Sequence, residues 1–339
     1  MKSILNKLFQ LFKRRQHEYV GVAEDIRSVS QKARDFQHEE FVAGVVQIKW
    51  VEKEWKKYSV RDQNGSFSCV SQSAAKALEI STGIVMSAKP YFLRANFPDR
   101  GMWIQNIGDI FRKIGTKTEA ELPSQNMNED EMNKAVGIVN GTKIFGYAFV
   151  KMDDIEVIAD VIAKHGHCIL VFNTSGLEWK RLVPTFLDLP ITFGHAVCAV
   201  DFALYNGQKS IIVDESWGSQ NTTQRVITED FLKKRCRGAM YFIFNKATSQ
   251  KPNYLFTRNM YFGLKGNEEV KKLQDCLAFE GLFPTDQSYH TGNYLQATAK
   301  AVLDFQRKHG VGAIQEVNAL QGKIVGPKTR AKLNKLYRK

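Results

Sequence analysis

The order of the expected elements constrains this chain most, because over its first 245 residues helical patterns come first and strand patterns follow. An alanine-rich stretch predicts a helix over residues 69–80 that ends near Gly83, and residues 104–114 predict another that ends at Gly115. Strand-like runs follow at 144–150, 168–172, 195–204, 210–213 and 239–244, with a helix expected over 153–164. Such a grouping indicates an α+β domain with two lobes, and not alternating βα units.

A cysteine stands at the expected start of the first helix, behind the loop sequence that runs from Gln63 through Asn64-Gly65-Ser66. A helix N-terminus carries partial positive charge and unpaired N–H groups, which favour a thiolate at Cys69. The same N–H groups can face a developing oxyanion, and the Gln63 side chain can supply a second donor. Cys69 is therefore a candidate nucleophile, although a buried structural cysteine on an alanine-rich helix gives the same pattern.

A nucleophilic thiol needs a base and a group that orients the base. His195 begins an apolar strand, and a second strand ends in the run Asp214-Glu215-Ser216-Trp217-Gly218. Between these strands Asn206-Gly207 is a strong hairpin signal. A hairpin places His195 and Glu215 near the same end, where Glu215 can accept from the imidazole and Trp217 can shield the pair from water.

The other histidines carry weaker signals. A lone histidine on a strand or near a helix end is more often structural than catalytic, and His165 and His167 are interpreted in that way. We expect the remaining four on the surface: His17, His38, His290 and His309.

The combination of these motifs resembles the papain-like cysteine peptidases. That family has a Gln, a Gly/Ser-rich loop that ends in the nucleophilic Cys, a His heading an apolar strand, and an Asn-Ser-Trp-Gly run. The Gln63-to-Cys69 spacing, the chain order and the ending Ser216-Trp217-Gly218 match it. The resemblance covers roughly residues 40–245 and implies a two-lobed domain with a helical lobe and an antiparallel β lobe.

The resemblance also implies roles for individual residues. Gln63 is expected to be the oxyanion-hole side chain, Cys69 the nucleophile, His195 the base and acid, and Trp217 the shield. Glu215 stands where the family has its orienting Asn, and a carboxylate can still hold the imidazolium. Val70 stands where the family usually has Trp. The implied enzyme is a cysteine-type peptidase that works by acyl transfer and needs no metal and no cofactor.

The cysteine content and the net charge limit which disulfides, metal sites and partners can be expected. Five widely spaced cysteines without a CxxC motif argue against a disulfide framework and against a zinc site. A formal net charge of +13 favours a polyanionic partner such as nucleic acid, anionic membrane or a bacterial cell-wall polymer. No nucleic-acid-binding motif is present, so we expect no nucleic acid partner.

A separate small segment follows at the C-terminal end. Helices are expected over residues 268–280, 296–309 and 327–336, with Pro327 well placed as a first helical residue. The segment resembles the helical type of peptidoglycan-binding domain, with an insertion at 315–321. A generic three-helix bundle that uses its leucine and phenylalanine residues only as core is the alternative.

These patterns give four expected regions. Residues 1–39 hold a basic amphipathic helix and a polar segment, and 40–245 form the peptidase domain. Residues 246–265 are a linker, and 266–339 are the peptidoglycan-binding-like domain. The first 15 residues place six apolar side chains on one helical face among basic residues: Ile4, Leu5, Leu8, Phe9, Leu11 and Phe12. This helix therefore either packs on a protein core or contacts an anionic membrane.

The sequence thus predicts a cysteine peptidase that cleaves peptide or protein substrates, targeted to bacterial cell wall through its C-terminal domain. We expect synthesis in the cytoplasm, because no signal peptide is recognisable, and action at the wall after lysis or from a virion, as with phage lysins. Two alternatives stay open. One is a protein-directed protease that the C-terminal domain merely anchors, and the other is a wall-binding or virion structural protein with a decayed site.

Overall fold

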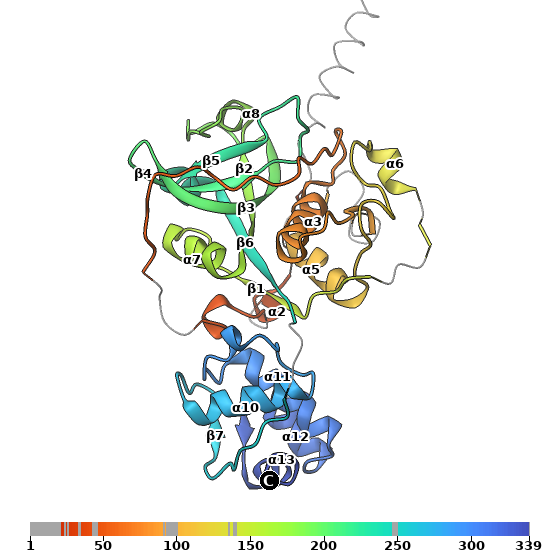
Figure 1. Cartoon of the computed structure of the whole chain (residues 1–339), viewed down its shortest axis with the longest axis vertical. Coiled ribbons are helices and arrows are strands. Elements are labelled where there is room, and N and C mark those ends of the chain that lie inside the picture. The colour runs from red at the N-terminus through yellow and green to blue at the C-terminus, as the bar shows by residue number, and fades with distance from the viewer. Residues whose placement is uncertain are drawn as a thin grey trace, which may run out of the picture. The chain divides into compact units, whose positions relative to one another are not determined.

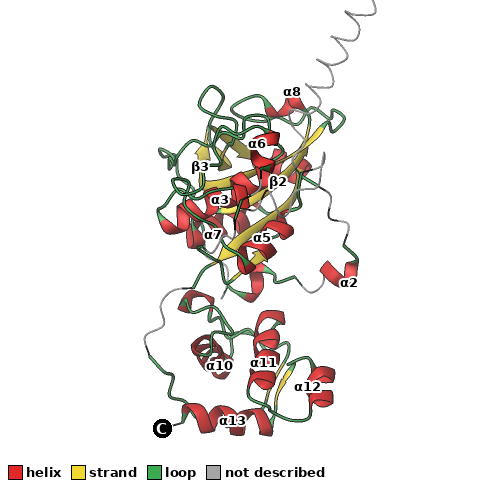
Figure 2. Ribbon diagram, turned by 90° about the vertical axis from the view of Figure 1, so that its right-hand side faces the viewer, coloured by secondary structure: helices red, strands yellow, loops and turns green. Residues whose placement is uncertain are grey.

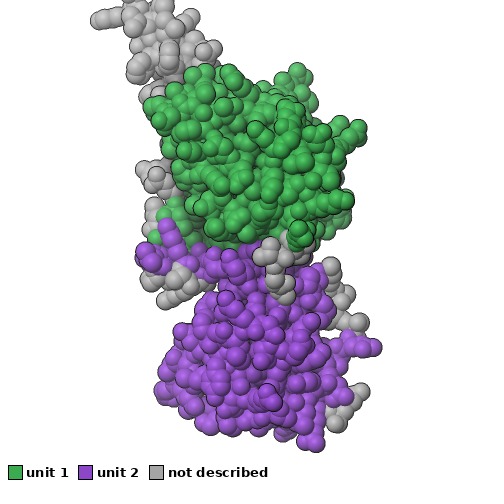
Figure 3. Space-filling model, turned by 90° about the vertical axis from the view of Figure 1, so that its left-hand side faces the viewer, with its two compact units in different colours: residues 1–27, 46–242 green, residues 28–45, 243–339 purple. Residues whose placement is uncertain are grey.

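Two compact units divide the chain in the computed structural model (Figures 1 and 3). Unit 1 comprises residues 1–27 and 46–242, and unit 2 comprises residues 28–45 and 243–339. The structure describes residues 22–23, 25, 27–32, 35–42, 47–90, 92, 101–134, 136–137, 141–245 and 250–338. The expected N-terminal amphipathic helix lies outside these residues.

A six-stranded sheet forms the core of unit 1, in the order β1-β6-β2-β3-β4-β5. Its strands are β1 (Gly146–Phe149), β2 (Cys168–Thr174), β3 (Phe193–Tyr205), β4 (Gln208–Asp214), β5 (Gln224–Thr228) and β6 (Cys236–Ile243). The pairs β2–β3, β2–β6, β3–β4 and β4–β5 are antiparallel. Residues of β2 and of the second half of β4 are buried almost without alternation, because both faces of the sheet are covered there.

The hairpin of β3 and β4 sets the register near the candidate site. Asn206 and Gly207 both have positive φ, 49° and 74°, as a two-residue turn of this kind requires. Tyr205 pairs with Gln208, and the pairing continues to Cys198 opposite Asp214 with one irregularity. The far end of the hairpin therefore carries His195 and Glu215 together, as the sequence predicted.

Unit 1 also contains helices, several of which lie against this sheet (Figure 2). In unit 1 they are α3 (Cys69–Thr82), α5 (Ile104–Lys113), α6 (Glu129–Asn133), α7 (Ile155–His165), α8 (Gly176–Trp179) and α9 (Glu229–Arg235). Helix α3 packs on β2 and β3, and α7 packs on β2, β3 and β4. The expected α+β class is confirmed. The sequence did not predict β5 or α9.

Unit 2 contains the three expected helices, α10 (Glu268–Phe279), α11 (Gln296–Lys308) and α13 (Pro327–Tyr337). A fourth helix, α12 (Ile314–Leu320), occupies the stretch that the sequence indicated as an insertion. A two-stranded sheet joins β7 (Met260–Tyr261), which lies within the expected linker, to β8 (Ile324–Val325). Two histidines expected on the surface, His38 and His290, are buried, and His290 lies 2.6 Å from the Asp275 carboxylate.

A short segment from the N-terminal part of the chain completes unit 2. The 3₁₀ turn η1 (His38–Glu40) brings the Glu40 carboxylate to the start of α11, where it accepts a 2.5 Å hydrogen bond from the Ala297 N–H. The next residue, Phe41, is 1% exposed, and its ring packs against the rings of Phe283 and Tyr289. His38, Glu40 and Phe41 are thus buried in unit 2, although residues 46–242 of unit 1 separate them in sequence from most of it.

None of the helices within the described ranges is both long enough and apolar enough to cross a membrane.

We predict that Phe41→Ala destabilises unit 2 and leaves unit 1 intact. Emptying this buried position costs about 3–5 kcal/mol for a phenylalanine. Hydrogen exchange of the α10 and α11 amides, read by mass spectrometry, should speed up while exchange in β2–β4 stays unchanged. Phe262→Ala is the control, because this ring is 43% exposed. Unchanged exchange in α10 and α11 would show that the segment does not contribute to unit 2.

Candidate active site

The loop before α3 places Cys69 as the first residue of that helix. Asn64 and Gly65 both take positive φ, 43° and 73°, and the chain reverses so that the Ser66 N–H donates to the Gln63 carbonyl at 2.8 Å. Glycine suits this conformation because it lacks a Cβ. Ser68 is the N-cap and does not cap the helix with its side chain. The N–H groups at the start of α3 thus remain near the thiol.

The Gln63 side chain is held at both ends of its amide. Its Oε1 accepts a 2.6 Å hydrogen bond from the Ser216 hydroxyl, and its Nε2 donates to the Ser66 carbonyl at 2.6 Å. An amide nitrogen carries two hydrogens. One of them therefore stays available for a substrate oxygen, which is what an oxyanion donor needs.

His195 lies between Cys69 and Glu215. Its Nε2 is 2.8 Å from a carboxylate oxygen of Glu215, and its ring also interacts with the Cys69 thiol. His195 is 1% exposed and Glu215 is 3% exposed. Because the carboxylate can only accept, it fixes the proton on Nε2 and leaves Nδ1 for the thiol.

The Glu215 carboxylate has two further donors that the sequence did not reveal. Its Oε1 accepts from the indole Nε1 of Trp179 and from Nε of Arg225, both at 2.6 Å. Both oxygens of a carboxylate accept hydrogen bonds. An amide would instead point its N–H₂ group either at the His195 donor or at the donors of Trp179 and Arg225. The Glu215 carboxylate is therefore matched to the donors of Trp179 and Arg225.

The charge of Glu215 sets the protonation of His195. Burial by itself lowers the pKa of His195, but the negative charge of Glu215 and the hydrogen bonds of Cys69 and Glu215 outweigh it and raise the pKa to about 9. Burial likewise opposes ionisation of Glu215, yet His195 and Arg225 lower its pKa below the ordinary value. At neutral pH the pair is thus imidazolium and carboxylate, the state that a thiolate nucleophile needs beside it.

Trp217 covers this pair, and its loop is fixed to the Gln63 segment. Its indole stacks on the His195 ring at 4.7 Å, with 30° between the planes. The loop is held because the Gln63 N–H donates to the Ser216 carbonyl at 2.8 Å. Gly218 has φ +77°, and a Cβ there would come 2.4 Å from a carboxylate oxygen of Asp62. Only glycine allows this close approach.

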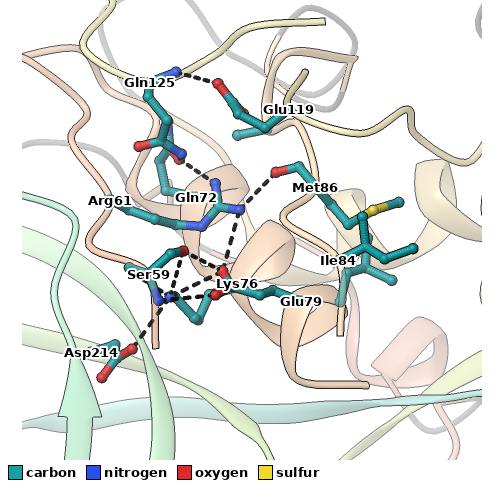
Figure 4. Close-up of polar contacts among 12 residues, drawn as sticks. Ser59, Arg61, Gln72, Lys76, Glu79, Ile84, Met86, Glu119, Gln125 and Asp214 are labelled. Atoms are coloured by element: carbon teal, nitrogen blue, oxygen red, sulfur yellow. Dashed lines mark hydrogen bonds and ion pairs between the residues drawn. The ribbon is translucent and has the colours of Figure 1, made fainter. Parts of the chain in front are cut away.

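Behind the thiol, a set of charged side chains joins α3 to the sheet; we call it the inner polar cluster (Figure 4). Its members are Ser59, Arg61, Gln72, Lys76, Glu79 and Asp214. Gln72, Lys76 and Glu79 follow Cys69 at spacings of 3, 4 and 3 residues, so they share its face of α3. The cluster therefore lies along the face of α3 that carries the nucleophile.

Lys76 is the centre of this cluster. Its ammonium lies 3.1 Å from Glu79 and 3.5 Å from Asp214, and it also donates to the Ser59 carbonyl. Arg61 donates to Gln72 Oε1 at 3.0 Å. Burial raises the pKa of Asp214, whereas the hydrogen bonds of Ser59 and the charge of Lys76 overcome burial and lower the pKa of Glu79. Asp214 adjoins Glu215 in sequence, so the cluster ties α3 to the strand that carries Glu215.

The other four cysteines are free thiols of a different kind. Cys168, Cys198, Cys236 and Cys276 are buried and unpaired as disulfides. Burial raises the pKa of each thiol, to about 12 for Cys236. They are therefore inert at neutral pH.

The structure brings all five residues selected from the sequence to one place: Gln63, Cys69, His195, Glu215 and Trp217. Trp179 and Arg225 were missed. Trp179 had no signal, because it reaches the site from the end of α8, 36 residues before Glu215. Arg225 had a weak one, a charged residue directly before the apolar pair Val226-Ile227 of β5. Among the described residues no group of three His, Cys, Asp or Glu side chains is placed to hold a metal ion.

Comparison with known proteins supports the fold assignment. No protein family model and no curated protein sequence matches the chain. Among solved structures, xylellain, a cysteine protease from Xylella fastidiosa, aligns with a TM-score of 0.54 at 16% identity, over 68% of this chain and 97% of that one. The bromelain protease from Ananas comosus gives 0.46 at 19% (56% and 94% covered), and digestive procathepsin L 3 of Tenebrio molitor gives 0.49 at 16% (62% and 76%). The similarity to xylellain shows a papain-like fold.

We predict that Glu215→Gln lowers the pKa of His195 by about 1–3 pH units, because it removes the nearest negative charge. NMR titration of the His195 ring protons, assigned with a His195→Gln variant, should show a midpoint near 9 in the unmodified protein and a lower one in Glu215→Gln. Glu121→Gln changes an exposed carboxylate and should leave the midpoint in place. An unchanged midpoint in Glu215→Gln would contradict the coupling.

We also predict that Lys76→Met lowers the free energy of unfolding of unit 1 by about 3–5 kcal/mol, because it leaves buried carboxylates without their cation. In an Asp214→Asn background the same substitution should cost less. Chemical denaturation followed by tryptophan fluorescence measures both costs. Equal costs in the two backgrounds would mean that Lys76 and Asp214 are not coupled.

Proposed function

We propose that unit 1 is a cysteine peptidase with Cys69 as nucleophile. The observation that carries the proposal is the position of His195, hydrogen-bonded to Glu215 and to the Cys69 thiol and held as an imidazolium at neutral pH. A nucleophile with an adjacent, oriented base is the arrangement that acyl transfer requires. The papain-like fold supports the same chemistry.

In this mechanism the Cys69 thiolate attacks a peptide carbonyl carbon, and the carbonyl electron pair moves to oxygen. The Gln63 side chain and the Cys69 backbone N–H hold the oxyanion. His195 gives its proton to the leaving amine as the C–N bond breaks, which leaves a thioester on Cys69. His195 then takes a proton from water, the hydroxide attacks the thioester, and the acid leaves with regeneration of the thiolate.

We further propose that the substrate is a peptide of the bacterial cell wall and that unit 2 attaches the enzyme to peptidoglycan. Two observations support this: the resemblance of residues 266–339 to the helical peptidoglycan-binding type, and a net charge of +13, which suits anionic wall polymers. Action after host lysis or from a virion fits the same picture. Membrane contact through residues 1–15 remains a prediction on residues outside the described part of the chain.

Two alternatives differ in what they predict. A protein-directed protease would cleave casein and leave peptidoglycan intact. A decayed site would give a Cys69 thiol that reacts with iodoacetamide no faster than free cysteine. The three hydrogen bonds to Glu215 argue against decay, because a buried carboxylate without a function to serve is costly to retain.

We predict that the protein releases new amino groups from purified peptidoglycan under reducing conditions and that Cys69→Ala abolishes this release. Amine labelling of the soluble products measures it. Cys198→Ala is the matched control, since it makes the same change at a buried thiol on β3 and should keep most of the activity. Release that persists in Cys69→Ala would overturn the assigned nucleophile, and no release by the unmodified protein would overturn the wall substrate.

A further inference from the structure

Arg225 lies in the core of unit 1, where an arginine is seldom found unless it is paired. Its side chain is 2% exposed. Strand β5 pairs with β4 so that Arg225 stands opposite Val213, and its Nε reaches Glu215 Oε1 at 2.6 Å. Compared with apolar side chains of similar size, a buried ion pair adds little net stability. Net stability alone therefore does not account for Arg225.

Two indole rings enclose the guanidinium of Arg225. Its central carbon lies 5.5 Å from the ring centroid of Trp179 and 5.2 Å from that of Trp217. One of its terminal nitrogens donates to the Arg181 carbonyl at 2.7 Å. A planar guanidinium can stack on aromatic rings with its faces while it donates hydrogen bonds from its edge. Because Trp217 itself stacks on His195, Arg225 also fixes the ring that covers the base.

The Glu215 carboxylate cancels a charge that the nucleophile needs. A positive charge beside a thiol favours its ionisation, and the imidazolium of His195 is such a charge. Glu215 lies 2.8 Å from that ring and offsets it, so the two groups together carry no net charge. When Arg225 is included, one positive charge is in excess. A thiolate on Cys69 then completes a set of four groups that is neutral as a whole.

The other buried charges near the site are paired among themselves. They form two sets, Glu178 with Arg235 at 2.7 Å, and Lys76 and Arg61 with Glu79 and Asp214 at 3.1–3.9 Å. Among the described residues, the ion pairs of Glu215 are those with His195 and Arg225. Arg225 is thus the cation that is left to offset Glu215 when the charge of His195 is to act on the thiol.

We propose that Arg225 is a positioning residue of the peptidase and supplies the positive charge that keeps Cys69 ionised while His195 is paired with Glu215. In this ionisation the S–H bond breaks, its electron pair stays on sulfur, and the proton leaves to water, because His195 already holds both of its protons. The inference rests on the proposed function for its effect on catalysis, whereas the charge balance follows from the contacts alone.

The charge balance is tested by the pH dependence of Cys69 alkylation with iodoacetamide, followed by mass spectrometry of the peptide that contains this residue. Arg225→Met should move the midpoint up by about 1 pH unit, because it removes a positive charge near the thiol. Glu215→Gln should move it down, and the double variant should return it to its original position. Arg225→Lys keeps the charge without the planar fork and should keep the midpoint.

Two results would overturn the charge balance. One is an unchanged midpoint in Arg225→Met, and the other is an Arg225→Lys midpoint that moves as far as that of Arg225→Met. If Arg225→Met does not fold, the double variant gives the same comparison against Glu215→Gln, because it buries neither the carboxylate nor the guanidinium. Its midpoint should then lie above that of Glu215→Gln, and equal midpoints would contradict the proposal.

Peptide cleavage by the same variants tests the effect on catalysis. Arg225→Met and Glu215→Gln should each lower kcat/KM, since each leaves one buried charge without its partner. The loss in the double variant should be about tenfold smaller than the product of the two separate losses. Losses that simply multiply would mean that the two residues act independently and would overturn the positioning role. Arg112→Met is the matched control, because it changes an exposed arginine and should leave the rate and its pH profile unchanged.

The two measurements separate this inference from the proposed activity, because alkylation needs only the thiol and the charges around it. The expected midpoint shifts without any Cys69-dependent cleavage would uphold the charge balance and overturn the peptidase. Cleavage that depends on Cys69 without any midpoint shift would uphold the peptidase and overturn the role of Arg225.

Discussion

The Glu215 carboxylate is the group on which the candidate site depends. It is buried, it accepts from His195, Trp179 and Arg225, and no one of these donors could balance it alone. With all three present, the carboxylate stays ionised and fixes both the orientation and the proton of the imidazole. Arg225 has a second effect, because its guanidinium also lies over the ring of Trp217 and so connects the orienting group to the shield.

The inner polar cluster holds two elements of the same site in position relative to one another. The nucleophile stands on a helix and the base on a sheet, so their separation depends on how these elements dock. Apolar packing alone would allow small sliding, whereas Lys76 between Glu79 and Asp214 has one favourable position. Compared with apolar side chains of similar size, a buried ion pair adds little net stability, although removing only one of its partners is costly. We infer that this cluster contributes alignment of α3 with β4 more than it contributes free energy of unfolding.

The features that could be predicted from the sequence are those with a short, local pattern. Cys69 at a helix start and Asn206-Gly207 between strands are short patterns with a direct physical meaning, and the structure places both as expected. Trp179 and Arg225 contact Glu215 only in the folded protein, because the residues are far apart in sequence or on neighbouring strands. No short sequence pattern therefore reveals these contacts. Residues 38–41 were divided between the N-terminal segment and the peptidase domain, whereas they belong to unit 2. A segment of four residues is too short to show a periodicity that would reveal its partners. Helix α12 was missed because most of its residues were interpreted as an insertion at 315–321.

The path of the chain between the units bears on how the protein is made. The backbone passes from unit 1 to unit 2 near residue 28, returns near residue 46, and enters unit 2 again near residue 243. During synthesis the His38–Phe41 segment therefore leaves the ribosome long before α10 and α11 exist to receive it. Unit 1 can collapse in the meantime, since domains fold as units in order of emergence. Phe41 must wait for its partners, so the time needed to translate residues 42–289 sets how long this aromatic ring stays available for the wrong contacts.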